Sequence, residues 1–417
     1  MKRRLCLLAA ALGISSAAMA DPISILFLGN SYTFGRLDPV MSYNAANVHD
    51  LTAGFNAISS TGTNPWEPHP WGGVPGIFKK FTDQSRLDYD VSISARNAAS
   101  LRGQFLNTAN AAWDLRGNAA LKTWDTVVLQ EQSDAALPAG RGRNADLATF
   151  NAYADQFERF IHNGAAQSYT ETQLFGSLAA CQATGSSATT CNTVRNIPQN
   201  ANASAATKIY LTQTWARPDM VFAHKITRAD PTTPDGRPIV DTTSAGGNAI
   251  LYYGSLAAMA ADLHASFAAK ASTNPAFAGV LPVGDAFQLA LDRNLVKTSG
   301  FYDANGVYVP NQPGDPMNLW WDDYLHASKY GSYLDALVQF GVITGLSPLS
   351  LGPNEQAAIE LGISSADAVA LQRIAADQLA IAAIPEPSTW ALLAGGVVLI
   401  GRFAKRRADR TVDEPAR

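Results

Sequence analysis

The chain has 417 residues, of which 47% are hydrophobic and 16% are charged, as is ordinary for a globular protein with a large core. This length allows one large domain with appendages or two modest domains. The formal net charge is only -4 at pH 7, and the body of the chain carries no basic stripe, so we expect no nucleic-acid partner.

The first twenty residues have the three parts of a secretion signal. Residues 2–4 are basic, residues 5–14 are apolar, and Ala18-Met19-Ala20 has the small-residue pattern of a cleavage site. A buried first helix is the structural alternative, but it leaves this order of parts unexplained. We therefore predict an exported protein whose signal peptide is 1–20 and whose mature chain begins at Asp21.

A serine follows the first predicted strand. The apolar run 23–28 predicts a buried strand, and Gly29-Asn30-Ser31 comes directly after it. Ligands of open α/β sheets bind beyond the carboxyl ends of the strands, so the Ser31 hydroxyl would lie at that edge. A helix that begins just after it would favour an oxyanion there. A helix N-cap has the same sequence context and is the alternative role of Ser31.

Further along the chain, apolar runs rich in Val, Ile and Leu alternate with helical stretches. This alternation predicts βαβ units and a parallel sheet covered by helices on both faces. We therefore expect an α/β, three-layer sandwich with a five-stranded parallel sheet. The further strands are predicted at 89–94, 126–129, 208–212 and 280–283, and helices at 145–163, 249–269, 285–293 and 328–340.

Two polar segments interrupt this plan, at 43–74 and 164–206. Long loops of this kind are often lids or binding loops, and poorly ordered decoration is the alternative. The second segment contains Cys181 and Cys191, which remain once the signal with Cys6 is removed. An oxidising compartment favours a disulfide between them; two free thiols are the alternative. No His or carboxylate cluster accompanies them, so we predict no metal site.

The C-terminal residues 384–417 have a distinctive order. Pro385-Glu386-Pro387 precedes the apolar run 390–400, and basic residues follow at 402–407. The run is shorter than the ~20 residues that usually span a bilayer. The basic residues after it favour keeping this end of the chain on the inner side of the membrane. This order resembles a PEP-CTERM sorting signal, which implies a short transmembrane segment and processing by an exosortase. An ordinary tail anchor is the alternative. Residues 346–383 are interpreted as a helical spacer before it.

Two motifs resemble the SGNH hydrolases, also called the GDSL family. Gly29-Asn30-Ser31-Tyr32-Thr33 is similar to the first block of that family, and Asp323-Tyr324-Leu325-His326 is similar to its last. The resemblance spans 21–345 and implies a flavodoxin-like SGNH hydrolase fold. It also implies that Ser31 is the nucleophile, that His326 accepts its proton and that Asp323 orients His326, as in a catalytic triad. Asp322 is a second candidate for the orienting acid.

The two middle blocks differ from the family pattern. Ala98 stands where the family has a glycine, and a backbone donor survives that change only if φ is negative. Gln132, in a Leu-Gln-Glu-Gln-Ser stretch found in variant branches, stands where the family has an asparagine. The resemblance thus implies an oxyanion hole formed by the N–H groups of Ser31 and Ala98 and by the Gln132 amide.

Together these features predict an exported serine esterase without cofactor or metal. Resembling enzymes remove acyl groups from carbohydrates or lipids, and export with the C-terminal signal favours an acylated extracellular carbohydrate as the substrate. A lipase or general esterase is less favoured because no apolar acyl groove is evident. The rival is a catalytically weak or inactive carbohydrate-binding surface protein that kept the fold, which the altered middle blocks favour. A structural envelope protein is a weaker alternative.

Overall fold

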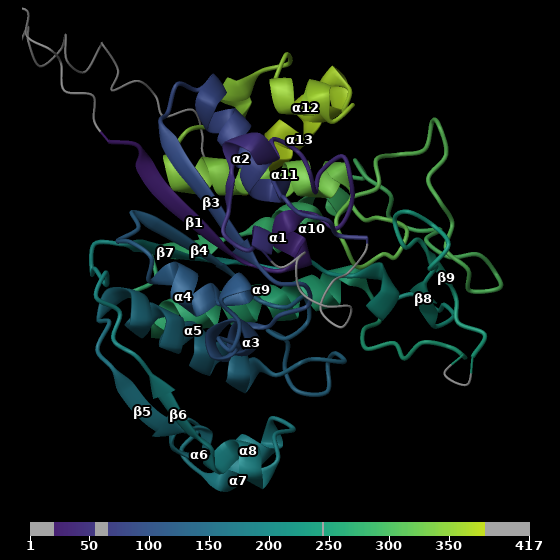
Figure 1. The fold of residues 1–417 in the computed structure, drawn as a ribbon. Helices are drawn as coiled ribbons and strands as arrows, with labels where there is room; N and C mark the ends of the chain where they lie inside the picture. Colours follow the sequence, from purple (N-terminus) through teal and green to yellow (C-terminus); the bar gives the residue numbers. More distant parts are fainter. Residues whose placement is uncertain (1–20, 55–65, 244–245, 380–417) are drawn as a thin grey trace, which may run out of the picture.

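The computed structural model describes residues 21–54, 66–243 and 246–379 (Figure 1). The predicted signal peptide at 1–20 and the predicted sorting signal at 384–417, with its short transmembrane segment, lie outside the described residues. In the part of the chain that the structure describes, no helix has both the length and the apolar character needed to cross a membrane.

The centre of the molecule is a six-stranded parallel sheet in the order β10-β7-β4-β1-β3-β2. The five predicted strands are all present, but the predicted strand number is wrong by one. The additional strand, β2, pairs with β3 at the edge of the sheet, and its two residues are too few to give an apolar pattern. The strands are β1 (Ile23–Gly29), β2 (His49–Asp50), β3 (Tyr89–Ala95), β4 (Thr126–Gln130), β7 (Lys208–Thr212) and β10 (Gly279–Leu281).

Without β2, the strand order is that of flavodoxin-like, doubly wound sheets. The chain order reverses between β1 and β4, which pair with each other in parallel. Such a reversal leaves a crevice beyond the carboxyl ends of the two strands, where ligands of these folds bind. The fold therefore brings the residues that follow β1 and β4 to one place.

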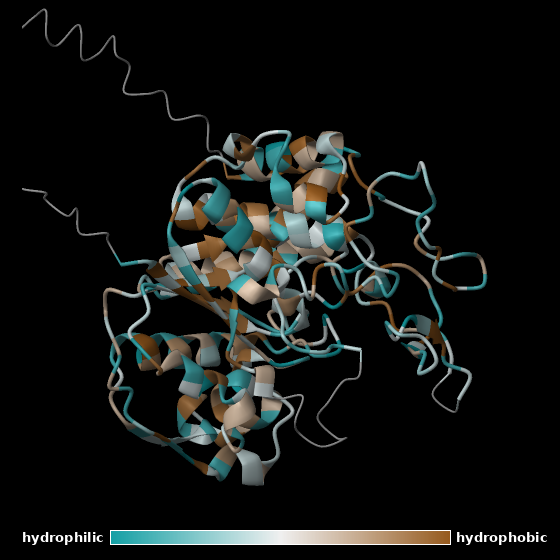
Figure 2. Ribbon diagram, turned by 45° about the horizontal axis from the view of Figure 1, so that its top comes forward, coloured by the Kyte–Doolittle hydropathy of each residue, from teal (hydrophilic) through white to brown (hydrophobic). Residues whose placement is uncertain are grey.

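Helices cover both faces of the sheet (Figure 1). One layer contains α2 (Gly73–Gln84) and α11 (Lys329–Thr344), and the other contains α3 (Leu101–Leu106), α4 (Leu115–Ala119), α5 (Leu147–His162) and α9 (Leu256–Thr273). Figure 2 shows hydrophobic residues in the central strands, where side chains such as Leu26, Phe27 and Val127 are almost fully buried. Other elements are α1 (Ser31–Phe34), α10 (Val283–Asp292), β8 (Thr227–Ala229), β9 (Pro238–Val240), η1 (Ala45–Asn47), η3 (Ala111–Trp113) and η4 (Pro218–Met220).

Side-chain caps set where the helices begin. The predicted helix at 249–269 begins later, at Leu256, because Ser255 caps it by accepting a hydrogen bond from the Ala258 N–H. Asp146 caps α5 in the same way. Ser328 caps α11 and accepts from the Tyr330 N–H, so this helix begins shortly after the motif that contains His326.

The segment interpreted as a helical spacer packs into the core of the domain. It contains η5 (Pro348–Leu351), α12 (Gln356–Glu360) and α13 (Ser365–Gln378). Leu371 and Ile374 of α13 are buried in the same apolar core as the sheet and α11. The apolar residues of α13, in the segment interpreted as a spacer, are therefore covered by the rest of the domain.

The segment 164–206 forms an arm that extends from the body of the molecule (Figure 1). It is an antiparallel hairpin with three short helices at its tip, where we had expected a loop. Its polar, four-residue strands lack the apolar alternation that predicts a strand. The arm consists of β5 (Gln167–Thr170), α6 (Glu171–Leu174), α7 (Leu178–Ala183), α8 (Ala188–Asn192) and β6 (Val194–Ile197). Cys181 and Cys191 form a disulfide that joins α7 to α8.

Replacing both Cys181 and Cys191 by serine is expected to destabilise the tip of this arm by about 2–3 kcal/mol, because the short loop regains its freedom in the unfolded state. Hydrogen exchange of the α7 and α8 amides checks this result. The amides of α5 serve as the control, since α5 lies in the body of the domain. Unchanged exchange in α7 and α8 would contradict the prediction.

Candidate active site

Ser31 lies at the end of β1, in the first turn of α1. The cap of this helix is Asn30, whose side chain accepts a hydrogen bond from the Tyr32 N–H at 3.1 Å. The alternative role of Ser31 as the N-cap is therefore wrong. Gly29 allows this turn, because a Cβ at that position would lie 1.9 Å from the Thr33 Oγ1. The Ser31 side chain is thus free for another partner.

The structure brings Ser31, His326 and Asp323 into one hydrogen-bonded chain. His326 Nε2 lies 2.8 Å from Ser31 Oγ, and His326 Nδ1 lies 2.6 Å from Asp323 Oδ2. A carboxylate only accepts hydrogen bonds, so Nδ1 carries the proton and Nε2 of the neutral ring accepts from the serine hydroxyl. This is the arrangement in which a histidine can take a proton from a serine.

Backbone hydrogen bonds fix the Asp323 carboxylate. Its Oδ1 accepts from the Leu325 N–H at 3.0 Å and from the His326 N–H at 2.9 Å. Burial raises the pKa of Asp323, but the His326 ring and these N–H groups outweigh burial and hold the pKa below its usual value. Asp322, the other candidate, faces Arg237 at 3.8 Å, so Asp323 is the acid that contacts His326.

Two aromatic side chains form hydrogen bonds to the loop that carries His326. The Leu325 carbonyl accepts from the Tyr32 hydroxyl at 2.9 Å and from the Trp215 indole N–H at 3.2 Å. The rings of Tyr32 and Trp215 are stacked with centroids 4.0 Å apart. Sequence reasoning missed these contacts because they join segments far apart in the chain. The position of Tyr32, directly after Ser31, is the only local signal.

A small cavity of about 100 Å³ lies against Ser31 and His326, and Ala98 and Gln132 also line it. Among the described residues, neither the Ser31 N–H nor the Ala98 N–H has a hydrogen-bond acceptor. The Gln132 amide donates to Ser133 Oγ at 3.1 Å, which leaves its second N–H. The three predicted oxyanion donors therefore border the same space as the serine hydroxyl.

Ala98 adopts a left-handed backbone conformation, with φ of 55°. The negative φ that we expected a surviving donor to need is therefore not what the structure has, although the Ala98 N–H has no hydrogen-bond acceptor among the described residues. A Cβ in this region of backbone conformation carries a strain of order 1–3 kcal/mol. No sequence pattern reveals this φ.

Replacing Ala98 by glycine is expected to raise the free energy of unfolding by about 1 kcal/mol, because glycine adopts a positive φ without a Cβ penalty. The N–H stays in place, so any hydrolytic activity should be retained. Chemical denaturation measures the change. The same substitution at Ala120, where φ is -100°, should give no such gain. A less stable A98G variant would contradict the prediction.

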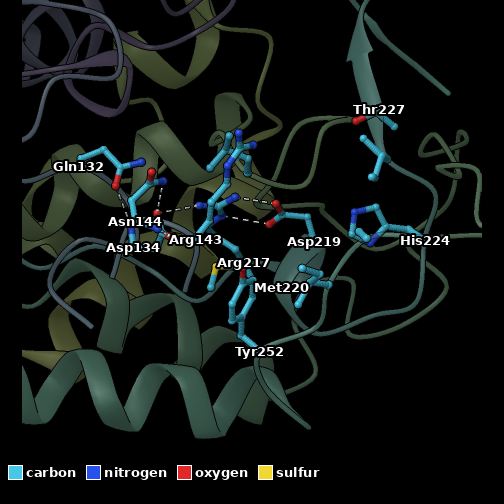
Figure 3. A pocket seen from close by; sticks show the side chains of 14 residues that line it. Gln132, Asp134, Arg143, Asn144, Arg217, Asp219, Met220, His224, Thr227 and Tyr252 are labelled. Carbon is cyan, nitrogen blue, oxygen red and sulfur yellow. Dashed lines mark hydrogen bonds and ion pairs between the residues drawn. The ribbon is translucent and has the colours of Figure 1, made fainter. Parts of the chain in front are cut away.

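A buried ion network centred on Arg217 (Figure 3) contacts Ser133, one of the residues that line the small cavity. The guanidinium donates to both carboxylate oxygens of Asp219, at 2.9 and 2.5 Å, and to Ser133 Oγ at 2.8 Å. It also lies 3.4 Å from Asp134, a buried carboxylate that accepts two hydrogen bonds from Asn144. Burial raises the pKa of Asp134, but Arg217 and Asn144 hold it below the usual value. The network links the chain after β4 to the chain after β7.

Two larger cavities adjoin the small one. One of about 640 Å³ shares Gln132 and Leu325 with it and is also lined by Arg217 and Tyr252 (Figure 3). The other, of about 440 Å³, shares Gln132 and Ala98 with it and reaches the arm at Thr184 and Ser186. Both have many polar lining side chains. Gln132 lies where the three cavities meet.

No group of three or more His, Cys, Asp or Glu side chains in the described ranges is arranged to hold a metal ion. The histidines outside the site have other partners. His264, for example, contacts Asp285 at 2.8 Å, and His162 contacts Glu158 at 2.8 Å.

No protein-family model matches the sequence, and no curated protein matches it. Among solved structures, the chain is similar to a DUF4886 family protein from Bacteroides uniformis, with 11% identity, a TM-score of 0.40 and coverage of 87% of this chain and 96% of that one. It is also similar to a candidate SGNH hydrolase from Slackia heliotrinireducens, with 15% identity, a TM-score of 0.33 and coverage of 78% of this chain and 100% of that one. A third similar structure is an extracellular lipase from Streptomyces rimosus, with 14% identity, a TM-score of 0.31 and coverage of 78% of this chain and 99% of that one. All three TM-scores are below 0.5, so we base function on the side-chain geometry of this chain.

Proposed function

We propose that this protein is a serine esterase in which Ser31 is the nucleophile. The observation that carries the proposal is the hydrogen-bonded chain from Asp323 through His326 to Ser31, with distances of 2.6 and 2.8 Å. His326 follows Ser31 by 295 residues in the sequence, and the hydrogen-bonded contact between them lies next to the carboxyl end of β1. A buried serine with a histidine and a carboxylate in line is suited to acyl transfer.

In the first half of the reaction, Ser31 Oγ attacks the ester carbonyl carbon while His326 Nε2 takes the hydroxyl proton. The Asp323 carboxylate stabilises the imidazolium that forms. The carbonyl oxygen becomes an oxyanion, and the free N–H groups of Ser31 and Ala98, with the Gln132 amide, would donate to it. When the tetrahedral intermediate collapses, the alcohol leaves with the proton from His326 and Ser31 carries the acyl group.

In the second half, a water molecule gives its proton to His326 and attacks the acyl carbon. The second tetrahedral intermediate uses the same three donors. It collapses to release the carboxylic acid, and His326 returns the proton to Ser31 Oγ. The chain supplies every proton-transfer group that these steps need.

The substrate that we propose is an O-acylated extracellular carbohydrate. Support comes from the 440 Å³ cavity, whose lining consists mostly of hydroxyl, amide and charged side chains that suit a sugar better than a long acyl chain. The lining of the 640 Å³ cavity is mixed. We further propose that the protein is exported, that its predicted C-terminal signal holds it at the membrane at least transiently and that an exosortase processes this signal. The residues behind these three proposals about location, 1–20 and 384–417, lie outside the described residues.

Release of acetate from acetylated polysaccharides and from an aryl acetate tests the proposal. We expect the purified protein to release acetate from at least one of them and the Ser31→Ala variant to release none above background. A folded wild-type protein that hydrolyses no ester of either kind would overturn the esterase proposal.

The second candidate function is carbohydrate binding without chemistry. The Gln132 amide favours it, because one of its two N–H groups already donates to Ser133 Oγ at 3.1 Å and only the other remains for an oxyanion. Calorimetric titration with the same polysaccharides separates the two functions. Binding by a wild-type protein that releases no acetate would support the second candidate.

A further inference from the structure

Glu131 is a buried acid beside the site that the mechanism above does not use. It directly precedes Gln132 in the chain after β4, and its exposed fraction is 1%. A carboxyl group is costly to bury unless its oxygens accept hydrogen bonds. The hydrogen-bond partners of Glu131 therefore indicate what its buried carboxyl group does in the structure.

The Glu131 side chain joins two loops of the site. Its Oε1 accepts from the Leu101 N–H at 2.9 Å and from the Gln132 N–H at 2.6 Å. Leu101 begins α3 directly after the turn that contains Ala98. One carboxyl oxygen thus fixes the spacing between the loop that carries the Ala98 N–H and the loop that carries the Gln132 amide.

The Glu131 backbone reaches the third loop. Its carbonyl accepts from Asn30 Nδ2 at 3.3 Å, and the same Nδ2 donates to the Ala99 carbonyl at 3.0 Å. Asn30 caps α1 and immediately precedes Ser31. All three segments that carry an oxyanion donor are therefore tied to Glu131, directly or through Asn30.

We infer that Glu131 is a positioning residue that holds the three oxyanion donors at a common spacing and does so best as a neutral acid. This inference rests on the proposed esterase function. The neutral form matters because an ionised carboxylate behind the donors would oppose the negative charge that develops on the substrate oxygen.

The surroundings of Glu131 favour the neutral form near neutral pH. Its Oε2 is buried and has no hydrogen-bond partner in the described part of the chain. Burial raises the pKa of Glu131 to about 7, against the lowering effect of the Gln132 and Leu101 N–H groups, and the charges of Asp146 and Asp134 raise it further. The cations that line the adjoining cavity are Arg102, from α3, and Arg143, from the loop before α5.

Two substitutions at Glu131 test the inference. Glu131→Gln keeps an oxygen for the two N–H groups and cannot ionise, whereas Glu131→Ala removes the acceptor. We expect E131A to lower kcat for an aryl acetate by about 10- to 100-fold with KM changed less than about twofold, since the donors act in the transition state. We expect E131Q to match the wild-type kcat at pH 6, and the ratio of its kcat to the wild-type kcat to rise as the pH increases through 7.

Asp335 provides the matched control. It is a buried acid of α11 whose carboxyl group accepts a hydrogen bond from the Gln339 amide, and burial raises its pKa to about 7 as well. The Asp335→Asn variant should therefore show a constant kcat ratio to wild type across the same pH range.

The outcomes separate this inference from the esterase proposal. An active wild-type protein with a normal kcat in E131A, or with a pH-independent E131Q ratio, would overturn the role of Glu131 and leave the esterase intact. If E131A does not fold, the E131Q ratio decides. A wild-type protein without esterase activity would overturn both.

Discussion

Replacing Ser31 by alanine is expected to lower kcat for an aryl acetate by roughly 10⁴- to 10⁶-fold, which is the scale seen when a triad nucleophile is removed. Ser31 Oγ is the atom that would form the bond to the acyl group, and no other described residue donates to His326 Nε2. The free energy of unfolding should stay within about 1.5 kcal/mol of wild type, because one hydrogen bond is lost. Initial rates and chemical denaturation measure the two quantities.

A buried serine outside the site is the matched control. Ser332 lies in α11, is 1% exposed, and its hydroxyl has no partner among the described residues. Ser332→Ala should therefore keep wild-type kcat. Asp323→Asn should lower kcat by about 10⁴-fold, because the amide no longer requires the proton on His326 Nδ1. Equal rates for Ser31→Ala and Ser332→Ala would refute the assignment of the nucleophile.

Replacing Arg217 by methionine is expected to lower the free energy of unfolding by about 3–5 kcal/mol at pH 7, since the change leaves the carboxylates of Asp134 and Asp219 without their cation. The Asp134 side chain is 1% exposed, so water replaces the lost partner poorly. The predicted loss is large enough to unfold a marginal domain. Denaturant titration over a range of pH measures it.

The pH dependence of this loss has a definite sign. The pKa of Asp134 is lowered in the folded protein, so its stabilising contribution is present above the unfolded-state value of 3.8 and is lost as the pH falls through the lower folded value. The difference between R217M and wild type should therefore shrink below about pH 4. Arg141, in an exposed pair with Asp262, is the control, and R141A should cost at most about 1 kcal/mol. A stability of R217M equal to that of R141A would contradict the expectation.

Sequence reasoning succeeded where a local pattern carried the information. Buried strands such as β1 and β4 are apolar runs that can be recognised without knowing their partners. Which of the two adjacent acids contacts the histidine could not be read from the sequence: Asp323 lies 2.6 Å from His326 Nδ1, whereas Asp322 lies 3.8 Å from Arg237.

Features that depend on tertiary contacts could not be predicted from the sequence. The ties from Tyr32 and Trp215 to the Leu325 carbonyl join residues that no spacing rule connects. The strand β2 is too short to show an alternation of apolar and polar residues, and β5 of the arm is polar. The positive φ of Ala98 contradicts the usual preference of alanine. For the ties to Leu325 and for β2, the deciding contact lies elsewhere in the chain.

Covalent labelling tests the central claim most directly. A fluorophosphonate reacts with a serine whose hydroxyl is activated by a neighbouring histidine and loses fluoride as the oxygen–phosphorus bond forms. Intact-mass and peptide measurements on the purified protein should show a single adduct, located on Ser31, and no adduct in His326→Ala over the same time. A folded wild-type protein that stays unlabelled, or that carries the adduct on another serine, would contradict the role of Ser31 as the nucleophile.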